Sequence, residues 1–266
     1  MASERLSTAK EAALRAGQEL VAIYRSGSTQ GELKADLTLV TEADRKADQI
    51  IQSLIKETYP QDGILSEESS TVYPHTQHTW VVDPLDGTAN FSHGLVYWGV
   101  SIAHLQDGQP HDAAVYFPLV DELYTASLGK GAALNGQPLT LSESPQQDLV
   151  PLFVHCSRMQ QQYKIRTPFK KRSLGAAAYN LCLVAKSTAA LALESTPRIW
   201  DFAGSWLILQ ESGAAVKALG KEQPFPAQPG LDYARKPYPI LAARSKEALK
   251  DAEAGITPKN INQKRR

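Results

Sequence analysis

The sequence predicts an α/β (α+β) fold with an antiparallel sheet in its first half and a mixed sheet in its second. Between residues 96 and 141, β-rich segments are separated by turn dipeptides, a pattern typical of consecutive antiparallel hairpins. These dipeptides are Asp107-Gly108, Asp121-Glu122 and Asn135-Gly136. After residue 150, strand-like and helix-like segments alternate, which favours an α/β layer.

Two amphipathic helices are expected near the start of the chain. Apolar residues recur at three- and four-residue steps over residues 3–25, and the helix that they predict ends at Gly27. A second helix is expected over 42–58, with Thr41 as its N-cap and Pro60 closing it. Short apolar runs of strand type follow at 63–65 and 79–82.

A polar break at residues 142–148 is expected to divide the chain into units 1–145 and 146–266. Residues 221–239 contain five prolines and little periodicity, so they are expected to form an ordered surface loop. In the second unit, strands are expected at 152–155, 188–193 and 240–242, and helices at 175–186, 201–212 and 245–254.

Composition and charge narrow the classes of function. The 266 residues are 42% hydrophobic and 21% charged, the profile of a globular enzyme. The 28 basic side chains balance 28 acidic ones, which argues against a nucleic-acid polymer or an anionic membrane as partner. No apolar run reaches the ~20 residues of a membrane span and no signal peptide is visible, so a cytoplasmic location is expected. Only two cysteines occur, Cys156 and Cys182, and both are expected to be buried and inert.

The stretch most informative about chemistry is Asp83-Pro-Leu-Asp-Gly-Thr88, which follows an apolar run. Pro84 should force a turn that brings both carboxylates and the Leu85 carbonyl towards one point, and converging oxygens of this kind suit Mg²⁺. Gly87 permits close approach of the backbone, and the N–H groups around Gly87 and Thr88 can face a phosphate at a helix start. Taken alone, these residues also fit a plain β-turn with solvated carboxylates.

Further acidic residues follow a strand or open a helix. Glu67 and Glu68 follow the strand-type run that starts at residue 63, Asp201 opens a helix, and Asp44 lies three residues after Thr41. Each position also has an ordinary structural explanation. The glutamates fit a solvated loop, Asp201 fits an N-cap, and Asp44 fits a capping box.

In their order along the chain these residues resemble the inositol monophosphatase family. The resemblance covers roughly residues 5–255 and rests on Thr41-Glu-Ala-Asp44, Ser66-Glu-Glu-Ser69, Asp83-Pro-Leu-Asp-Gly-Thr-Ala-Asn90 and Trp200-Asp201. One departure is Ser66, because the family usually has glycine there. The resemblance implies a layered, alternating αβαβα fold and a Li⁺-sensitive, Mg²⁺-dependent hydrolysis of a phosphate monoester by metal-activated water. It also implies a homodimer as a possible assembly.

By motif position, the resemblance implies roles for individual residues. Two or three Mg²⁺ ions would be held by Glu67, Asp83, the Leu85 carbonyl, Asp86 and Asp201. Asp44 and Thr88 would orient and activate the attacking water, with Glu67 close by. The positions at which relatives contact the sugar or inositol ring match Gly175, Ala176 and Glu194.

The substrate is expected to be a small phosphate ester, with myo-inositol monophosphate ranked first. The alternatives with the same chemistry are bisphosphate nucleotides of the 3′-phosphoadenosine 5′-phosphate type, fructose 1,6-bisphosphate and histidinol phosphate. A catalytically silent regulatory relative is the alternative from another class. A basic segment could bind a second phosphate, although such a run more often forms a solvated face; it contains Arg158, Arg166, Lys170, Lys171 and Arg172.

Overall fold

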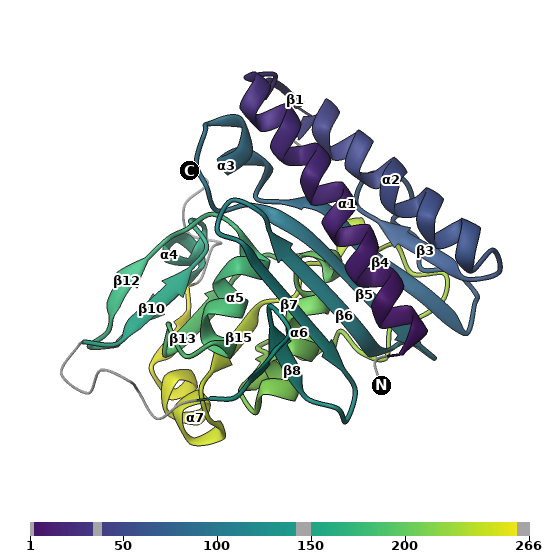
Figure 1. The fold of residues 1–266 in the computed structure, drawn as a ribbon. Coiled ribbons are helices and arrows are strands. Elements are labelled where there is room, and N and C mark those ends of the chain that lie inside the picture. The colour runs from purple at the N-terminus through teal and green to yellow at the C-terminus, as the bar shows by residue number, and fades with distance from the viewer. Residues whose placement is uncertain (1–2, 34–38, 142–149, 260–266) are drawn as a thin grey trace.

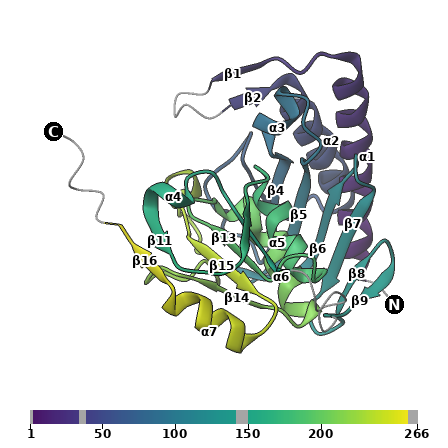
Figure 2. The ribbon, with the colours of Figure 1, turned by 90° about the vertical axis from the view of Figure 1, so that its left-hand side faces the viewer.

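Helices and sheets alternate in layers in the computed structural model, which describes residues 3–33, 39–141 and 150–259. Helices α1 (Glu4–Ser26) and α2 (Glu42–Thr58) lie side by side on one face of a seven-stranded sheet (Figure 1). Helices α5 (Ala177–Ala185) and α6 (Ile199–Ser212) pack between this sheet and a five-stranded sheet. Helix α7 (Lys246–Ala254) covers the outer face of the second sheet (Figure 2). The expected αβαβα layering is confirmed.

The seven-stranded sheet contains the predicted hairpins. Its strands, in order across the sheet, are β3 (Gly63–Ser66), β4 (His78–Asp86), β5 (Gly99–Gln106), β6 (Gln109–Phe117), β7 (Glu122–Ser127), β8 (Ala132–Leu134) and β9 (Gln137–Leu139). From β4 onwards, neighbouring strands are antiparallel, as expected. Strand β3 is parallel to β4, a pairing that the hairpin pattern does not predict.

The five-stranded sheet is mixed, as expected. Its order is β12 (Lys170–Arg172), β10 (Leu152–His155), β13 (Leu191–Glu194), β15 (Ile240–Ala243) and β14 (Ala215–Ala218). Strand β10 is parallel to both neighbours, and the other pairs are antiparallel. Smaller elements are β1 (Gly31–Leu33), β2 (Leu39–Thr41), α3 (Thr88–Ser92), α4 (Met159–Gln162), β11 (Tyr163–Ile165), the 3₁₀ turn Tyr233–Arg235 and β16 (Ile256–Pro258). The break at 142–148 lies outside the described residues, so the division into 1–145 and 146–266 stays a prediction.

Small residues let α1 approach the sheet closely. Its buried face is mostly alanine, and a Cβ on Gly17 would lie 2.6 Å from the ring of Tyr116 on β6. The start of α1 is also tied to the sheet, because the Ser3 hydroxyl donates a hydrogen bond of 2.6 Å to Asp112. The same carboxylate contacts Nδ1 of His104 at 3.3 Å, and the hydroxyl of Ser127 donates to it. These contacts fix the helix over β5, β6 and β7.

The proline-rich segment 221–239 is not simply a surface loop, and that expectation is wrong in part. Tyr233 and Tyr238 are only 1% and 4% exposed, and their rings stack on each other. Phe225 and Tyr238 contact Phe202 of α6 in edge-to-face geometry. Proline content predicts the lack of regular elements here, but it does not reveal that the aromatic side chains enter the core.

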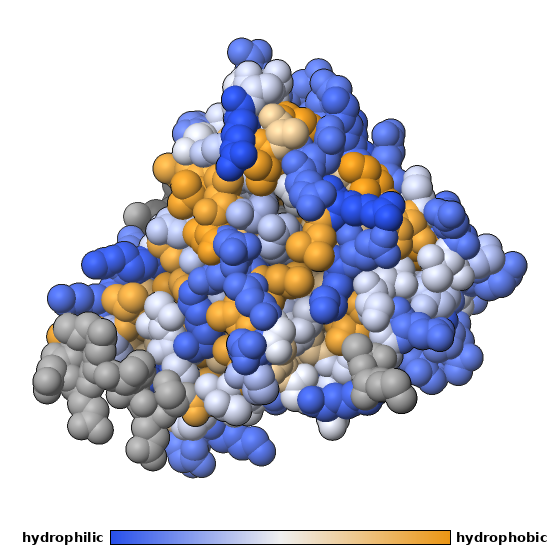
Figure 3. All heavy atoms as spheres, viewed as in Figure 1, coloured by the Kyte–Doolittle hydropathy of each residue, from blue (hydrophilic) through white to orange (hydrophobic). Residues whose placement is uncertain are grey.

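The outer surface is a mosaic of hydrophilic residues and small hydrophobic patches on the face shown in Figure 3. Leu95 and Val96, which follow α3, are 53% and 42% exposed and are among the most exposed large hydrophobic side chains. Within the described ranges, none of the helices combines the length and the apolar character that a membrane crossing requires. The cytoplasmic location and the homodimer stay predictions.

Candidate active site

The two aspartates of the central motif lie on one strand that does not end at Pro84. The expected turn is instead a bulge, because β4 continues to Asp86 and its register with β5 shifts between Asp83 and Asp86. Asp83 pairs with Ser101 and Asp86 pairs with Gly99, so their partners are two residues apart and face the same side. On a regular strand, residues three apart face opposite sides. The bulge therefore puts both carboxylates on one face.

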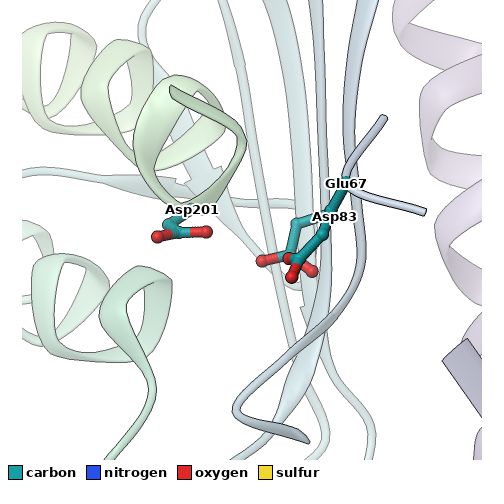
Figure 4. A group of neighbouring side chains, drawn as sticks. All are labelled: Glu67, Asp83 and Asp201. Carbon is teal, nitrogen blue, oxygen red and sulfur yellow. The ribbon is translucent and has the colours of Figure 1, made fainter. Parts of the chain in front are cut away.

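Glu67 and Asp201 approach Asp83 from two other elements. Ser66 at the end of β3 pairs with Val82 in parallel, so Glu67 and Asp83 follow at neighbouring positions. Asp201 lies in the first turn of α6 and faces them from the opposite side (Figure 4). One carboxylate oxygen from each of the three acids lies within 4.8 Å of the others. These acids are close enough to share a cation.

Asp86 lines the same cavity and is held by the start of α5. Its two carboxylate oxygens accept hydrogen bonds from the backbone N–H groups of Ala177 and Ala178, each at 2.9 Å. The first turn of a helix has N–H groups without helical partners and favours a negative charge. The orientation of Asp86 is therefore fixed by backbone groups of the second half of the chain.

Asp44 completes the predicted capping box and also contacts Thr88. Its Oδ2 accepts hydrogen bonds from the Thr41 backbone N–H at 2.7 Å and the Thr41 hydroxyl at 2.6 Å, which completes the capping box of α2. Its Oδ1 lies 3.0 Å from the hydroxyl oxygen of Thr88. The same hydroxyl lies 3.1 Å from the Leu85 carbonyl oxygen. The predicted pair of Asp44 and Thr88 is therefore in hydrogen-bond contact.

Gly87 and Gly175 let the backbone close around this site. Gly87 has φ of 89°, and a Cβ there would lie 2.9 Å from the Tyr97 carbonyl oxygen and 3.1 Å from Cβ of Ala176. Gly175 has φ of 83°, and a Cβ there would lie 2.6 Å from Oδ1 of Asn90. Gly87, Gly175 and Ala176 all line the cavity, as their predicted binding roles require.

Glu194 lies at the end of β13 and lines the same cavity. Its side chain accepts a hydrogen bond of 2.7 Å from the amide of Asn180 on α5, and the residue is 3% exposed. Burial raises the pKa of Glu194 to about 8, although the Asn180 hydrogen bond opposes the rise. Asn180 is a residue that the sequence analysis missed, because an asparagine in an alanine-rich helix gives no local signal of this contact.

The cavity has a volume of about 410 Å³ and collects residues from both sheets. Cys156 lines it and is partly exposed, so the expectation that both cysteines are buried holds only for Cys182. Of the basic segment, only Arg158 lines this cavity, whereas Arg166 lines a separate one of about 290 Å³. The other lining residues are Glu67, Asp83, Leu85, Asp86, Gly87, Thr88, Ala89, Ser157, Gly175, Ala176, Ala177, Glu194, Thr196, Pro197 and Asp201.

The electrostatics of the acid cluster fit a Mg²⁺ site. Burial raises the pKa values of Asp83 and Asp201 well above 3.8, and the negative charge of Glu67 raises both further. Burial also raises the pKa of Asp86 to about 7, although its backbone hydrogen bonds oppose the rise. A cation would offset this repulsion, and carboxylate and carbonyl oxygens are the ligands that Mg²⁺ prefers.

The fold and the acidic cavity together define a phosphatase-like protein with a candidate metal site. The model of the inositol monophosphatase family matches residues 1–254, and the chain belongs to this family. A putative Nus factor SuhB from Neisseria meningitidis serogroup B is 34% identical over 82% of this chain and 88% of its own length. Inositol monophosphatase 3 from Solanum lycopersicum is 35% identical over 79% of this chain and 84% of its own length.

Solved structures agree with this assignment. The crystal structure of the extragenic suppressor protein SuhB from Bartonella henselae is similar with a TM-score of 0.79 and 29% identity. The similarity covers 95% of this chain and 98% of that one. The layered fold is therefore shared over nearly the whole chain.

Proposed function

We propose that this protein is a Mg²⁺-dependent phosphatase that hydrolyses a phosphate monoester of a small metabolite, with myo-inositol monophosphate as the first candidate. The observation that supports this most strongly is the convergence of Glu67, Asp83 and Asp201 within 4.8 Å in a cavity that Thr88 also lines. Three acids brought together from a strand end, a β-bulge and a helix start have no evident structural purpose, because their mutual repulsion opposes folding.

The metal would be held by Glu67, Asp83, the Leu85 carbonyl, Asp86 and Asp201. Bound there, Mg²⁺ would supply positive charge that stabilises the phosphate oxygens and the leaving oxygen and makes the attacking water more acidic. The backbone N–H groups of Gly87 and Thr88 would contact the phosphate, since Gly87 lacks the side chain that would block this approach.

Thr88 and Asp44 would position the attacking water and accept its proton. When the Thr88 hydroxyl donates to Oδ1 of Asp44, its oxygen lone pairs are free to accept a hydrogen bond from a water in the cavity. Burial raises the pKa of Asp44, which makes this carboxylate a better proton acceptor. The proton would pass from water to the Thr88 oxygen while the Thr88 proton passes to Asp44.

Glu194 supports a polyol as the organic part of the substrate. A buried carboxyl fixed by Asn180 at 2.7 Å offers a rigid hydrogen-bonding group for hydroxyls of a ring. Gly175 and Ala176 would contact the same ring through backbone groups, because neither has a side chain that fills the space. Fructose 1,6-bisphosphate, bisphosphate nucleotides and histidinol phosphate stay alternatives with the same chemistry.

The proposal is tested by measuring phosphate release from these esters with Mg²⁺ and with a chelator. We expect turnover of at least one ester that chelation stops and added Mg²⁺ restores. Asp83→Asn should abolish turnover, while the control Asp251→Asn, an exposed acid on α7, should not change it. Turnover that survives both chelation and Asp83→Asn would contradict the proposed metal chemistry.

A regulatory role is the second candidate, because relatives named SuhB Nus factor are as similar to this chain as relatives named inositol monophosphatase. The complete set of cavity acids favours catalysis, since a silent relative would have no need to keep a mutually repelling cluster. Absence of turnover on every ester, with Mg²⁺ binding intact, would favour the regulatory role.

A further inference from the structure

The catalytic cavity has one basic side chain among its acidic ones. Five acidic residues line it, and Arg158 is the single lysine, arginine or histidine among its lining residues in the described chain. Mg²⁺ would compensate the acids around Asp83, which leaves Arg158 as a separate positive group in the lining of the cavity. This guanidinium has no role in the hydrolysis derived above.

The loop that carries Arg158 is held in place on both sides. It follows β10, and the Cys156 N–H donates to the Leu193 carbonyl of the neighbouring parallel strand at 3.3 Å. On the other side, Met159 is 1% exposed and its N–H donates to the Cys156 carbonyl at 3.2 Å. Arg158 therefore follows β10, and Glu194 ends the adjacent parallel strand β13. Both lie at the carboxyl ends of these strands, which is where α/β sheets bind ligands.

The guanidinium of Arg158 is also available to a ligand. Within residues 3–33, 39–141 and 150–259, no ion pair or side-chain hydrogen bond is formed by Arg158, and the residue is exposed. The other basic residues of this segment lie elsewhere: Arg166 lines the separate cavity, and Lys170, Lys171 and Arg172 are exposed on the edge strand β12. Of the basic residues in this segment, Arg158 alone lines the catalytic cavity.

Resting on the proposed phosphatase function, we propose that Arg158 binds a second anionic group of the substrate. The favoured esters then carry a phosphate or a carboxylate in addition to the phosphate that is cleaved. A planar guanidinium presents paired N–H donors that match both anions. Glu194 binds hydroxyls while Arg158 binds the anion, so a doubly anionic polyol ester uses both groups. Myo-inositol monophosphate is hydrolysed without the Arg158 contact.

The test compares substrates that differ only in the second group. Fructose 1,6-bisphosphate is paired with fructose 6-phosphate, and 6-phosphogluconate is paired with sorbitol 6-phosphate, so the two pairs distinguish phosphate from carboxylate. In each pair we measure the ratio of kcat/KM for the doubly anionic ester to kcat/KM for its singly anionic partner. The ratio is measured for the wild type, Arg158→Gln, Arg158→Lys and the control Arg166→Gln. We expect Arg158→Gln to lower at least one ratio by roughly tenfold, equivalent to about 1.4 kcal/mol, and Arg158→Lys to lower it less. Arg166→Gln should leave both ratios unchanged.

Salt and binding provide independent readouts. Because Arg158 is exposed, the preference for the doubly anionic ester should shrink as the salt concentration rises. Calorimetric binding of the same esters to Thr88→Ala, with and without Arg158→Gln, should show the same change in ratio without turnover. Equal losses on both members of each pair, or no preference for either doubly anionic ester, would overturn the role of Arg158. Absence of hydrolysis with the binding preference intact would contradict only the proposed phosphatase function.

Discussion

The metal-free protein should lose stability as the pH rises from about 5 to about 8, because its cavity acids then ionise without a cation. In the folded chain, burial raises the pKa of Asp86 from 3.8 to about 7 and that of Glu194 from 4.5 to about 8. The folded state therefore binds more protons than the unfolded state in this range, and the free energy of unfolding falls with rising pH. Bound Mg²⁺ should remove this loss.

The size of the effect follows from Asp86. The difference between 3.8 and about 7 corresponds to about 4 kcal/mol at roughly 1.36 kcal/mol per pKa unit. Roughly 2–3 kcal/mol of this is lost between about pH 5 and pH 7, where the unfolded group is ionised and the folded group is still largely protonated. In a chain of this size 1 kcal/mol moves the melting temperature by roughly 2 °C, so this carboxyl alone contributes a fall of roughly 5 °C.

The assay is thermal unfolding at about pH 5 and about pH 8, with a chelator and with Mg²⁺. Asp83→Asn is the informative variant, because an amide oxygen can still accept the Leu85 N–H hydrogen bond of 3.0 Å while the charge is removed. At the higher pH the metal-free variant should melt above the metal-free wild type and gain less from Mg²⁺. Asp251→Asn should behave as the wild type. A less stable metal-free Asp83→Asn, or a wild type that gains stability with pH under chelation, would refute the reasoning.

Three further outcomes are expected. Thr88→Ala should lower kcat by ~10²–10⁴ with little change in KM, because a positioned general base typically accelerates a reaction by this factor. A larger effect on KM than on kcat in the phosphate-release assay would make Thr88 a phosphate ligand instead. Glu194→Ala should raise KM for myo-inositol monophosphate by roughly tenfold to a hundredfold, with a smaller effect on an aryl phosphate, and equal losses on both would assign Glu194 a structural role. Burial lowers the pKa of His104, so on acidification His104 takes up a proton in the unfolded state before it does in the folded state, and stability falls as the pH is lowered through about 6.5. The melting temperature of His104→Gln should fall less steeply over this range, and an unchanged dependence on pH would contradict this.

Local signals in the sequence predict the elements well where neighbouring residues decide the structure. The capping box of α2 needs only Thr41 and Asp44, three residues apart, and both hydrogen bonds are present. The hairpins from β5 to β9 follow from turn residues such as Asp107 and Asn135, which adopt the positive φ that these turns require.

Local signals do not predict which distant segments pair with each other. Glu67 is close to Asp83 because β3 is parallel to β4, and nothing in the two segments encodes this direction. The bulge between Asp83 and Asp86 depends on the register with β5, whereas Pro84 alone predicts a turn. The usual burial of cysteines predicts a buried Cys156, whereas its position directly after β10 exposes it to the cavity.

The carboxylate of Asp44 couples local unfolding of α2 to the geometry of the site, because it holds both. Oδ2 holds the first turn of α2 through Thr41, and Oδ1 holds Thr88 in the cavity. When the first turn of α2 frays, the carboxylate that orients Thr88 is released with it. Thr41 does not line the cavity, yet its two hydrogen bonds to Asp44 hold the carboxylate that contacts Thr88, so a change at Thr41 should disturb the site from outside it.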